Sequence, residues 1–135
     1  MSSRRQERRL AIDILFQADV TGTDGRNALE GWVRSGRSVP EFTRALVEGV
    51  SDHLVEIDRT IAAHSEGWTV DRMASVDRTV MRVASYELTF GGQVPVGVAI
   101  DEAVRAAKDL STEDSGRFVN GILGKMAREL DPDQT

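Results

Sequence analysis

The segment that most constrains the fold runs from residue 75 to residue 90, SVDRTVMRVASYELTF. At about 100° per residue, its apolar side chains cover roughly 220° of a helical wheel and leave only a narrow polar strip. A helix that is apolar on most sides is surrounded by other helices. We therefore expect this segment to be the central helix of an all-α domain, with Ser75 as its N-cap and the two glycines at 91–92 as its stop.

The same 3.6-residue period recurs along the rest of the chain, and no segment alternates over the length of a strand. A serine and a glutamate three residues apart, Ser38 and Glu41, form the pattern of a capping box at the start of one long helix. Polar residues 111–116 are expected to form a loop that caps the last helix. The apolar residues that recur with this period predict further helices over residues 4–20, 27–34, 38–64, 95–110 and about 117–130.

A chain of 135 residues has the size of one domain. Residues 65–74 contain Gly67 and interrupt the helical pattern, which predicts an N-terminal subdomain of about 1–66 and a C-terminal subdomain of about 67–135 that share one interface. We expect the ends of the chain, residues 1–3 and 131–135, to be disordered. Gly121 and Gly124 share a face of the last helix, where glycine usually marks the close approach of another element.

Composition excludes several classes of function. The chain has no cysteine, which excludes disulfides and thiolate metal sites. His53 and His64 lie about 16 Å apart along one predicted helix, too far to bind one metal ion. No apolar run approaches the ~20 residues of a membrane span, so we expect a cytoplasmic protein without a membrane partner. The net charge of −5 argues against indiscriminate binding of nucleic acid but allows a local basic patch.

No catalytic motif is present, and we expect neither enzyme activity nor a cofactor. Asp77 and Glu87 fall inside the apolar arc of the central helix, where an acid/base pair is one interpretation. Ten residues of helix separate them by about 15 Å, so a structural role is favoured. Glu87 is predicted to accept hydrogen bonds from the first amides of the next helix, near Pro95.

The most basic segment is the start of the first helix, where residues 1–12 hold four arginines and one glutamate. One interpretation is a patch that binds phosphates, with Phe16 available to stack on a base. The other is a solvated helix end, with Phe16 packed on a neighbouring element. The charged residues of segment 95–110, such as Glu102 and Arg105, are expected to be solvated.

Four segments resemble the NusB family of bacterial transcription antitermination factors: RRQERRLAIDILFQAD, VDRTVMRVASYEL, VPVGVAIDEAVRAAK and EDSGRFVNGILGK. The resemblance implies seven helices in two fused halves that each resemble a three-helix bundle. It also implies pairing with NusE, a small-subunit ribosomal protein, and binding of single-stranded boxA RNA. Such a pair would join the antitermination complex of RNA polymerase on ribosomal RNA operons, without catalysis.

The resemblance also implies an RNA-binding set in two segments, which we expect to lie side by side. The family often has tyrosine at the position of Phe16. Gln6 and Glu7 interrupt the basic motif, and Asp101 stands where asparagine is more usual. The implied RNA-binding residues are Arg4, Arg5, Arg8, Phe16, Asp114, Arg117 and Phe118.

Two other functions stay open. NusB-like domains also serve some RNA-modifying enzymes as accessory domains, although this chain has no Gly-rich cofactor loop. Alternatively, the chain is a protein-interaction adaptor in which Phe16, Trp32 or Trp68 anchors a helix interface. For the NusE surface we expect the second half of the chain, near Trp68 and the central helix.

Overall fold

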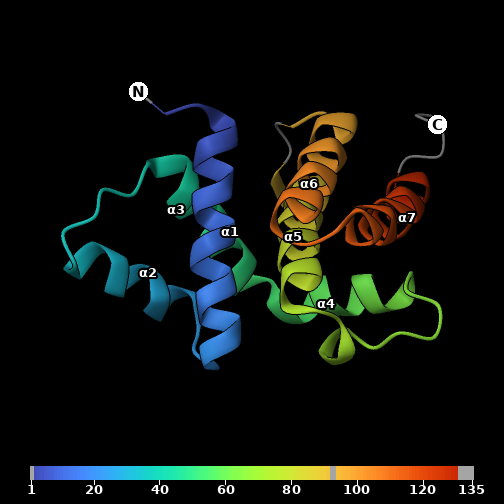
Figure 1. The fold of residues 1–135 in the computed structure, drawn as a ribbon, viewed down its shortest axis with the longest axis horizontal. Helices are drawn as coiled ribbons and strands as arrows, with labels where there is room; N and C mark the ends of the chain where they lie inside the picture. The colour runs from blue at the N-terminus through green and yellow to red at the C-terminus, as the bar shows by residue number, and fades with distance from the viewer. Residues whose placement is uncertain (1, 92–93, 131–135) are drawn as a thin grey trace.

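The computed structural model describes residues 2–91 and 94–130. Within these residues the chain forms seven α-helices and no strand, so the all-α prediction is confirmed (Figure 1). A 3₁₀ turn and a π-helical turn join the helices. The elements are α1 (Arg4–Thr21), α2 (Gly25–Arg34), α3 (Glu41–Asp52), α4 (Leu54–Ala63), η1 (Val70–Arg72), α5 (Ser75–Tyr86), η2 (Glu87–Gly91), α6 (Val96–Leu110) and α7 (Glu113–Leu130).

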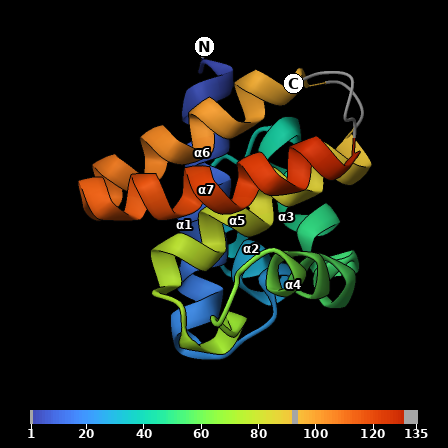
Figure 2. The ribbon, with the colours of Figure 1, turned by 90° about the vertical axis from the view of Figure 1, so that its right-hand side faces the viewer.

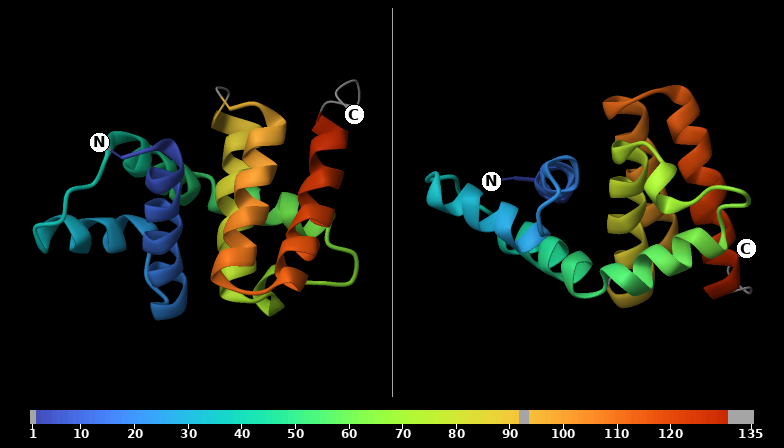
Figure 3. Two further views of the ribbon diagram at one scale, coloured as in Figure 1. Left: turned by 45° about the horizontal axis from the view of Figure 1, so that its top comes forward. Right: turned by 90° about the horizontal axis from the view of Figure 1, so that it is seen from below.

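Helix α5 is the central helix, as the sequence predicts. It packs against α1, α3, α4, α6 and α7, and Figure 3 shows it between α1 and the C-terminal pair α6 and α7. Met81 and Val83 are almost completely buried. The polar strip is also covered, because Ser85 is 1% exposed and both Arg78 and Arg82 are partly buried in ion pairs. No face of α5 is therefore open to solvent.

The ends of α5 differ from the prediction. Ser75 is the first helical residue, and Ala74 occupies the N-cap position without a side-chain hydrogen bond. The α-helical part ends at Tyr86, after which η2 continues as a π-helical turn to Gly91. The second glycine of the predicted stop, Gly92, lies outside the described residues, as does the predicted disordered tail at 131–135.

The single helix predicted over residues 38–64 is wrong. It is two helices, α3 and α4, which meet at His53 with φ −115° and ψ 20°. The His53 ring stacks on Phe90, with ring centroids 3.8 Å apart. Leu54, which a straight helix would bury with Val50, is 37% exposed. The apolar spacing continues across the break without a glycine or proline, so the sequence pattern contained no sign of it.

Two predicted helix starts are also wrong. Helix α3 begins at Glu41 without a side-chain cap, so Ser38 forms no capping box. Helix α7 begins at Glu113, inside the predicted loop, where Thr112 Oγ1 accepts a hydrogen bond from the Ser115 amide. The capping box lies at the start of α1, where Ser3 and Gln6 exchange hydrogen bonds of 3.1 and 2.8 Å. Ser3 is thus held in place rather than disordered.

The helices form two groups, with α1, α2 and α3 on one side and α4 to α7 on the other (Figures 1 and 3). Helix α4 packs against α5 and α7, so a division at His53 fits this packing better than one at residue 66. The division into subdomains stays a prediction. Asp19 of α1 links the groups through ion pairs of 2.8 Å to Arg78 and 3.1 Å to Arg82, and Arg82 also binds Asp58 of α4.

The expectation of close approach at Gly121 and Gly124 is wrong within this chain. Among residues 2–91 and 94–130, a Cβ atom at Gly121 would meet nothing within 4 Å, and at Gly124 it would approach only the Arg128 side chain. Close approach occurs instead at Gly49, where a Cβ atom would lie 2.3 Å from the Tyr86 ring. Gly49 therefore allows α3 to pack directly on the end of α5.

Candidate nucleic-acid interface

The start of α1 presents Arg4 and Arg5 at the surface, where their side chains are 69% and 51% exposed. Arg4 forms an ion pair with Glu7 at 3.1 Å, and its guanidinium also lies 4.3 Å from the centroid of the Phe42 ring. Arg5 binds both carboxylate oxygens of Glu102 on α6. Both arginines are thus held in place, yet remain accessible to a ligand.

Arg8 differs from its neighbours because it lies in the interior. Its Nε and Nη2 atoms donate hydrogen bonds of 2.8 and 2.9 Å to the two carboxylate oxygens of Glu87. The side chains of Arg8 and Glu87 are only 7% and 2% exposed. The structure therefore removes Arg8 from the accessible RNA-binding set and gives it a structural role.

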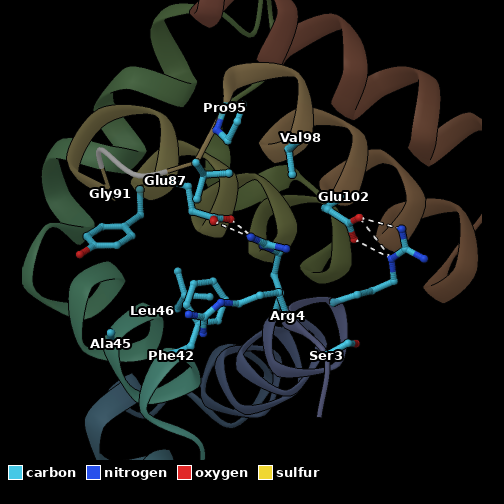
Figure 4. A pocket seen from close by; sticks show the side chains of 14 residues that line it. Ser3, Arg4, Phe42, Ala45, Leu46, Glu87, Gly91, Pro95, Val98 and Glu102 are labelled. Atoms are coloured by element: carbon cyan, nitrogen blue, oxygen red, sulfur yellow. Dashed lines mark hydrogen bonds and ion pairs between the residues drawn. The ribbon is translucent and has the colours of Figure 1, made fainter. Parts of the chain in front are cut away.

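Glu87 is buried and paired, as the sequence predicts, but its predicted partner is wrong. The carboxylate binds Arg8 of α1 rather than the first amides of α6. Figure 4 shows Glu87 above a cavity of about 840 Å³ between α1, α3 and α6. Phe42, Pro95 and Val98 line the apolar part of this cavity, while Arg4 and Glu102 lie at its polar side.

The second predicted segment forms the first turns of α7. Arg117 and Asp114 are both exposed and bind each other. Phe118 is partly buried, because its ring packs edge-on against Trp68 with centroids 5.7 Å apart. Phe16 of α1 is also partly buried. Each of the two phenylalanine rings thus has only part of its surface available for stacking on a base.

The prediction that the two segments lie side by side is wrong. Helix α6 lies between α1 and α7 in the views of Figures 1 and 3, and Figure 2 shows α6 packed along α7 with α1 behind them. A ligand that reaches both segments must therefore cross α6. Helices α6 and α7 pack closely together, with Gly116 directly under the Lys108 side chain.

Two carboxylates of α6 face α1 and pair with its arginines. The sequence did not predict these pairs. Glu102 is 13% exposed and pairs with Arg5, and Asp109 pairs with Arg9 at 2.8 Å. The hydrogen bond from Arg5 lowers the pKa of Glu102, and that from Arg9 lowers the pKa of Asp109. Both acids therefore stay ionised at neutral pH. The partners lie far apart in the chain, so no local sequence signal could have identified the pairs.

Asp77 and Glu87 do not form a catalytic pair. Glu87 is occupied by Arg8, whereas Asp77 is 8% exposed and faces Ser115. Burial raises the pKa of Asp77, although its polar neighbour Ser115 opposes this shift. Its Oδ1 atom has no hydrogen-bond partner among the described residues. Across residues 2–91 and 94–130, no cluster of three or more His, Asp and Glu side chains could hold a metal ion.

None of the helices in the described part of the chain combines the length and the apolar character needed to cross a membrane.

The model of the NusB family matches residues 5–128, nearly the whole chain. The chain belongs to the NusB family. The transcription antitermination protein NusB of Saccharopolyspora erythraea is 48% identical over 130 residues, which are 94% of this chain and 88% of that protein. The NusB of Symbiobacterium thermophilum is 46% identical over 139 residues, covering 95% of this chain and 91% of its own.

Solved structures of this family share the fold. T. maritima NusB superposes with a TM-score of 0.86 at 36% identity, covering 98% of this chain and 96% of that one. A chain from the complex of antitermination factors NusB and NusE with double-stranded RNA superposes with a TM-score of 0.82 at 25% identity. That match covers 93% of this chain and 96% of the other. The seven helices and their order are therefore those of NusB.

Proposed function

We propose that this chain is a transcription antitermination factor that binds RNA together with NusE. The observation that carries the proposal is the match to the NusB family over residues 5–128, together with relatives that are named transcription antitermination proteins. The exposed arginines at the start of α1 supply the positive charge that RNA binding needs. The chain acts by binding and not by catalysis.

The RNA surface consists of Arg4 and Arg5 on α1 and Arg117 on α7, whose exposed guanidinium groups bind phosphates. Phe16 and Phe118 stack on unpaired bases through the part of each ring that the helices leave uncovered. Asp114 lies beside this surface and holds Arg117 in place until a phosphate replaces it. Arg8 contributes indirectly, because it fixes the start of α1 to η2.

The preferred RNA is single-stranded boxA. An A-form duplex hides the base edges that a sequence-specific protein must contact, whereas a single strand exposes them. The related NusB–NusE complex contains double-stranded RNA, so the two forms need a direct comparison. Because boxA is an element of ribosomal RNA operons, the factor acts within the RNA polymerase antitermination complex in the cytoplasm.

The surface that binds NusE lies on the second group of helices. Helix α5 has no open face, so the central helix cannot contribute directly. Trp68, in contrast, is 52% exposed although its ring packs on Phe118. An exposed tryptophan held by a second aromatic ring has the properties of an interface anchor. Trp68 therefore belongs to the NusE surface.

Fluorescence anisotropy with labelled boxA RNA tests the proposal. The purified chain, mixed with NusE, should bind single-stranded boxA more tightly than a scrambled strand of equal length and composition. Duplex boxA should bind more weakly than the single strand. Equal affinity for boxA and scrambled RNA, together with retained binding of NusE, would favour the protein-interaction adaptor instead.

A further inference from the structure

A groove between α1 and α6 runs from the first candidate RNA-binding segment toward the end of α6. It encloses about 530 Å³ and is bordered on one side by the first turns of α1. On the other side it reaches Asp109, close to the end of α6 and four residues before α7 begins. The groove is lined by Arg5, Gln6, Arg9, Leu10, Asp13, Arg105 and Asp109.

Arg105 is the cation of this groove that has no carboxylate partner among the described residues. It is exposed, and it follows Glu102 by three residues and precedes Asp109 by four. This spacing places all three side chains on the same face of α6, the face that binds α1. Arg105 is close enough to lower the pKa of both acids through its charge. It therefore stands between the two ion pairs that join the helices.

We propose that this groove is a phosphate track in which Arg9 and Arg105 bind backbone phosphates of the RNA. The inference rests on the proposed function and extends it to two residues outside the implied RNA-binding set. The track would carry a strand from Arg5 at the start of α1 across α6 to Arg117 on α7. The other cation of α6 is Lys108, which is 44% exposed and lies 3.7 Å from Glu113 at the start of α7.

Asp109 regulates this track by competing with the RNA. It binds Arg9 at 2.8 Å, so a phosphate can reach Arg9 only by replacing that carboxylate. The pair is partly exposed, with Arg9 at 26% and Asp109 at 57%, and exposed ion pairs of this kind are weak. A polyanion that makes several contacts at once can therefore displace the acid, whereas a single anion gains little.

The lining of the groove favours RNA over an acidic protein segment. Among the described residues that line the groove, Leu10 is the one apolar side chain and none is aromatic. Protein interfaces derive most of their affinity from buried aromatic and apolar anchors, which this groove does not offer. Binding of a polyanionic backbone needs only cations along its path. Three arginines stand against Asp13, Asp109 and the Glu102 carboxylate that binds Arg5, so the path is close to neutral and becomes positive when Asp109 is neutralised.

The test compares single variants of the full chain with NusE at saturating concentration and labelled boxA RNA across a salt series. Arg9→Ala and Arg105→Ala should each weaken binding several-fold at low salt and reduce the salt slope by about 0.7. The matched control is Arg34→Ala, which removes an exposed arginine at the end of α2, where no ion pair holds it among the described residues. It should leave the affinity and the salt slope unchanged.

Neutralising the competing acid provides the second arm. Asp109→Asn should tighten RNA binding by a factor of a few, and this gain should disappear in the Arg9→Ala background. If the parent chain binds boxA but Arg9→Ala and Arg105→Ala behave like Arg34→Ala, the phosphate track is wrong and the proposed function stands. If these variants lose binding of poly-glutamate or NusE but keep RNA binding, the groove is a protein surface and the track is also wrong. A parent chain that does not bind boxA overturns both proposals.

Discussion

Arg8 of α1 and Glu87 of η2 form a bidentate ion pair in the interior, with N···O distances of 2.8 and 2.9 Å. It joins the first helix to the end of the central helix, across the boundary between the two helix groups. The guanidinium and the carboxylate compensate each other's loss of hydration. The position of the start of α1 therefore depends on a buried ion pair that is not accessible to RNA.

Removing one partner of this pair should be costly. Glu87→Ala should lower the free energy of unfolding by about 3–5 kcal/mol, because it leaves the Arg8 charge buried without a counterion. Urea denaturation measures the change. The double variant Arg8→Met with Glu87→Leu should recover most of the loss, since apolar residues of similar size can replace a buried pair. A Glu87→Ala variant with the stability of the parent would contradict this structural role.

Asp77 should make the protein less stable at neutral pH than an amide at the same position. Burial raises its folded pKa above the unfolded value, so the native state bears a cost whenever the carboxyl group is ionised. This cost is present above the folded pKa and vanishes below the unfolded pKa. Asp77→Asn should therefore be more stable than the parent at neutral pH, and the difference should shrink in acid.

Urea unfolding of the parent and Asp77→Asn over a pH series measures this difference directly. All other titrating groups are shared by the two proteins, so their contributions cancel. A difference that stays constant with pH would show that Asp77 does not titrate differently in the folded and unfolded states.

Alanine substitutions at Gly49 and Gly121 should change the free energy of unfolding in opposite directions. At Gly49, the new Cβ atom would lie 2.3 Å from the Tyr86 ring, so the α3–α5 contact must open. We expect a loss of about 1–3 kcal/mol, as for other overpacked sites. At Gly121 the Cβ atom meets open space, and the better helix propensity of alanine should add up to about 1 kcal/mol. Thermal melts of the two variants measure both effects, and equal melting temperatures would contradict the packing of Tyr86 on Gly49.

Replacing Arg4 and Arg5 together by alanine should weaken boxA binding and leave the fold intact. Both side chains are more than half exposed, so their loss removes phosphate contacts rather than core packing. Two lost contacts should reduce the salt slope by about 1.4 for a single strand. Anisotropy across a salt series measures the slope, and circular dichroism checks the helix content. Arg8 stays unchanged in this variant, since its loss would disturb the core.

An unchanged salt slope in the Arg4 and Arg5 variant would show that the phosphate contacts do not lie at the start of α1. Phe118→Ala provides a contrasting measurement. Loss of stacking should lower the affinity by about 1–3 kcal/mol per base with little change of slope. Because Phe118 also packs on Trp68, the thermal stability of the Phe118→Ala variant must be measured as well.

The sequence by itself determined the all-α class, the central position of segment 75–90 and the burial of Glu87. Each of these follows from the spacing of apolar and polar residues within one helix, which is local information. The resemblance to NusB supplied the family and the candidate RNA-binding residues. The break at His53 escaped prediction, because the apolar spacing of α3 continues into α4.

Only the tertiary structure decided which of the similar arginines is available to a ligand. Arg4, Arg5 and Arg8 lie within little more than one turn of α1, and the sequence treats them alike. Arg8 is buried because Glu87, 79 residues later, meets it from η2. Tertiary packing also decided the pairing of Arg9 with Asp109 and the position of α6 between the two candidate RNA-binding segments. Contacts between distant helices depend on how their surfaces pack, which the period of any single helix does not contain.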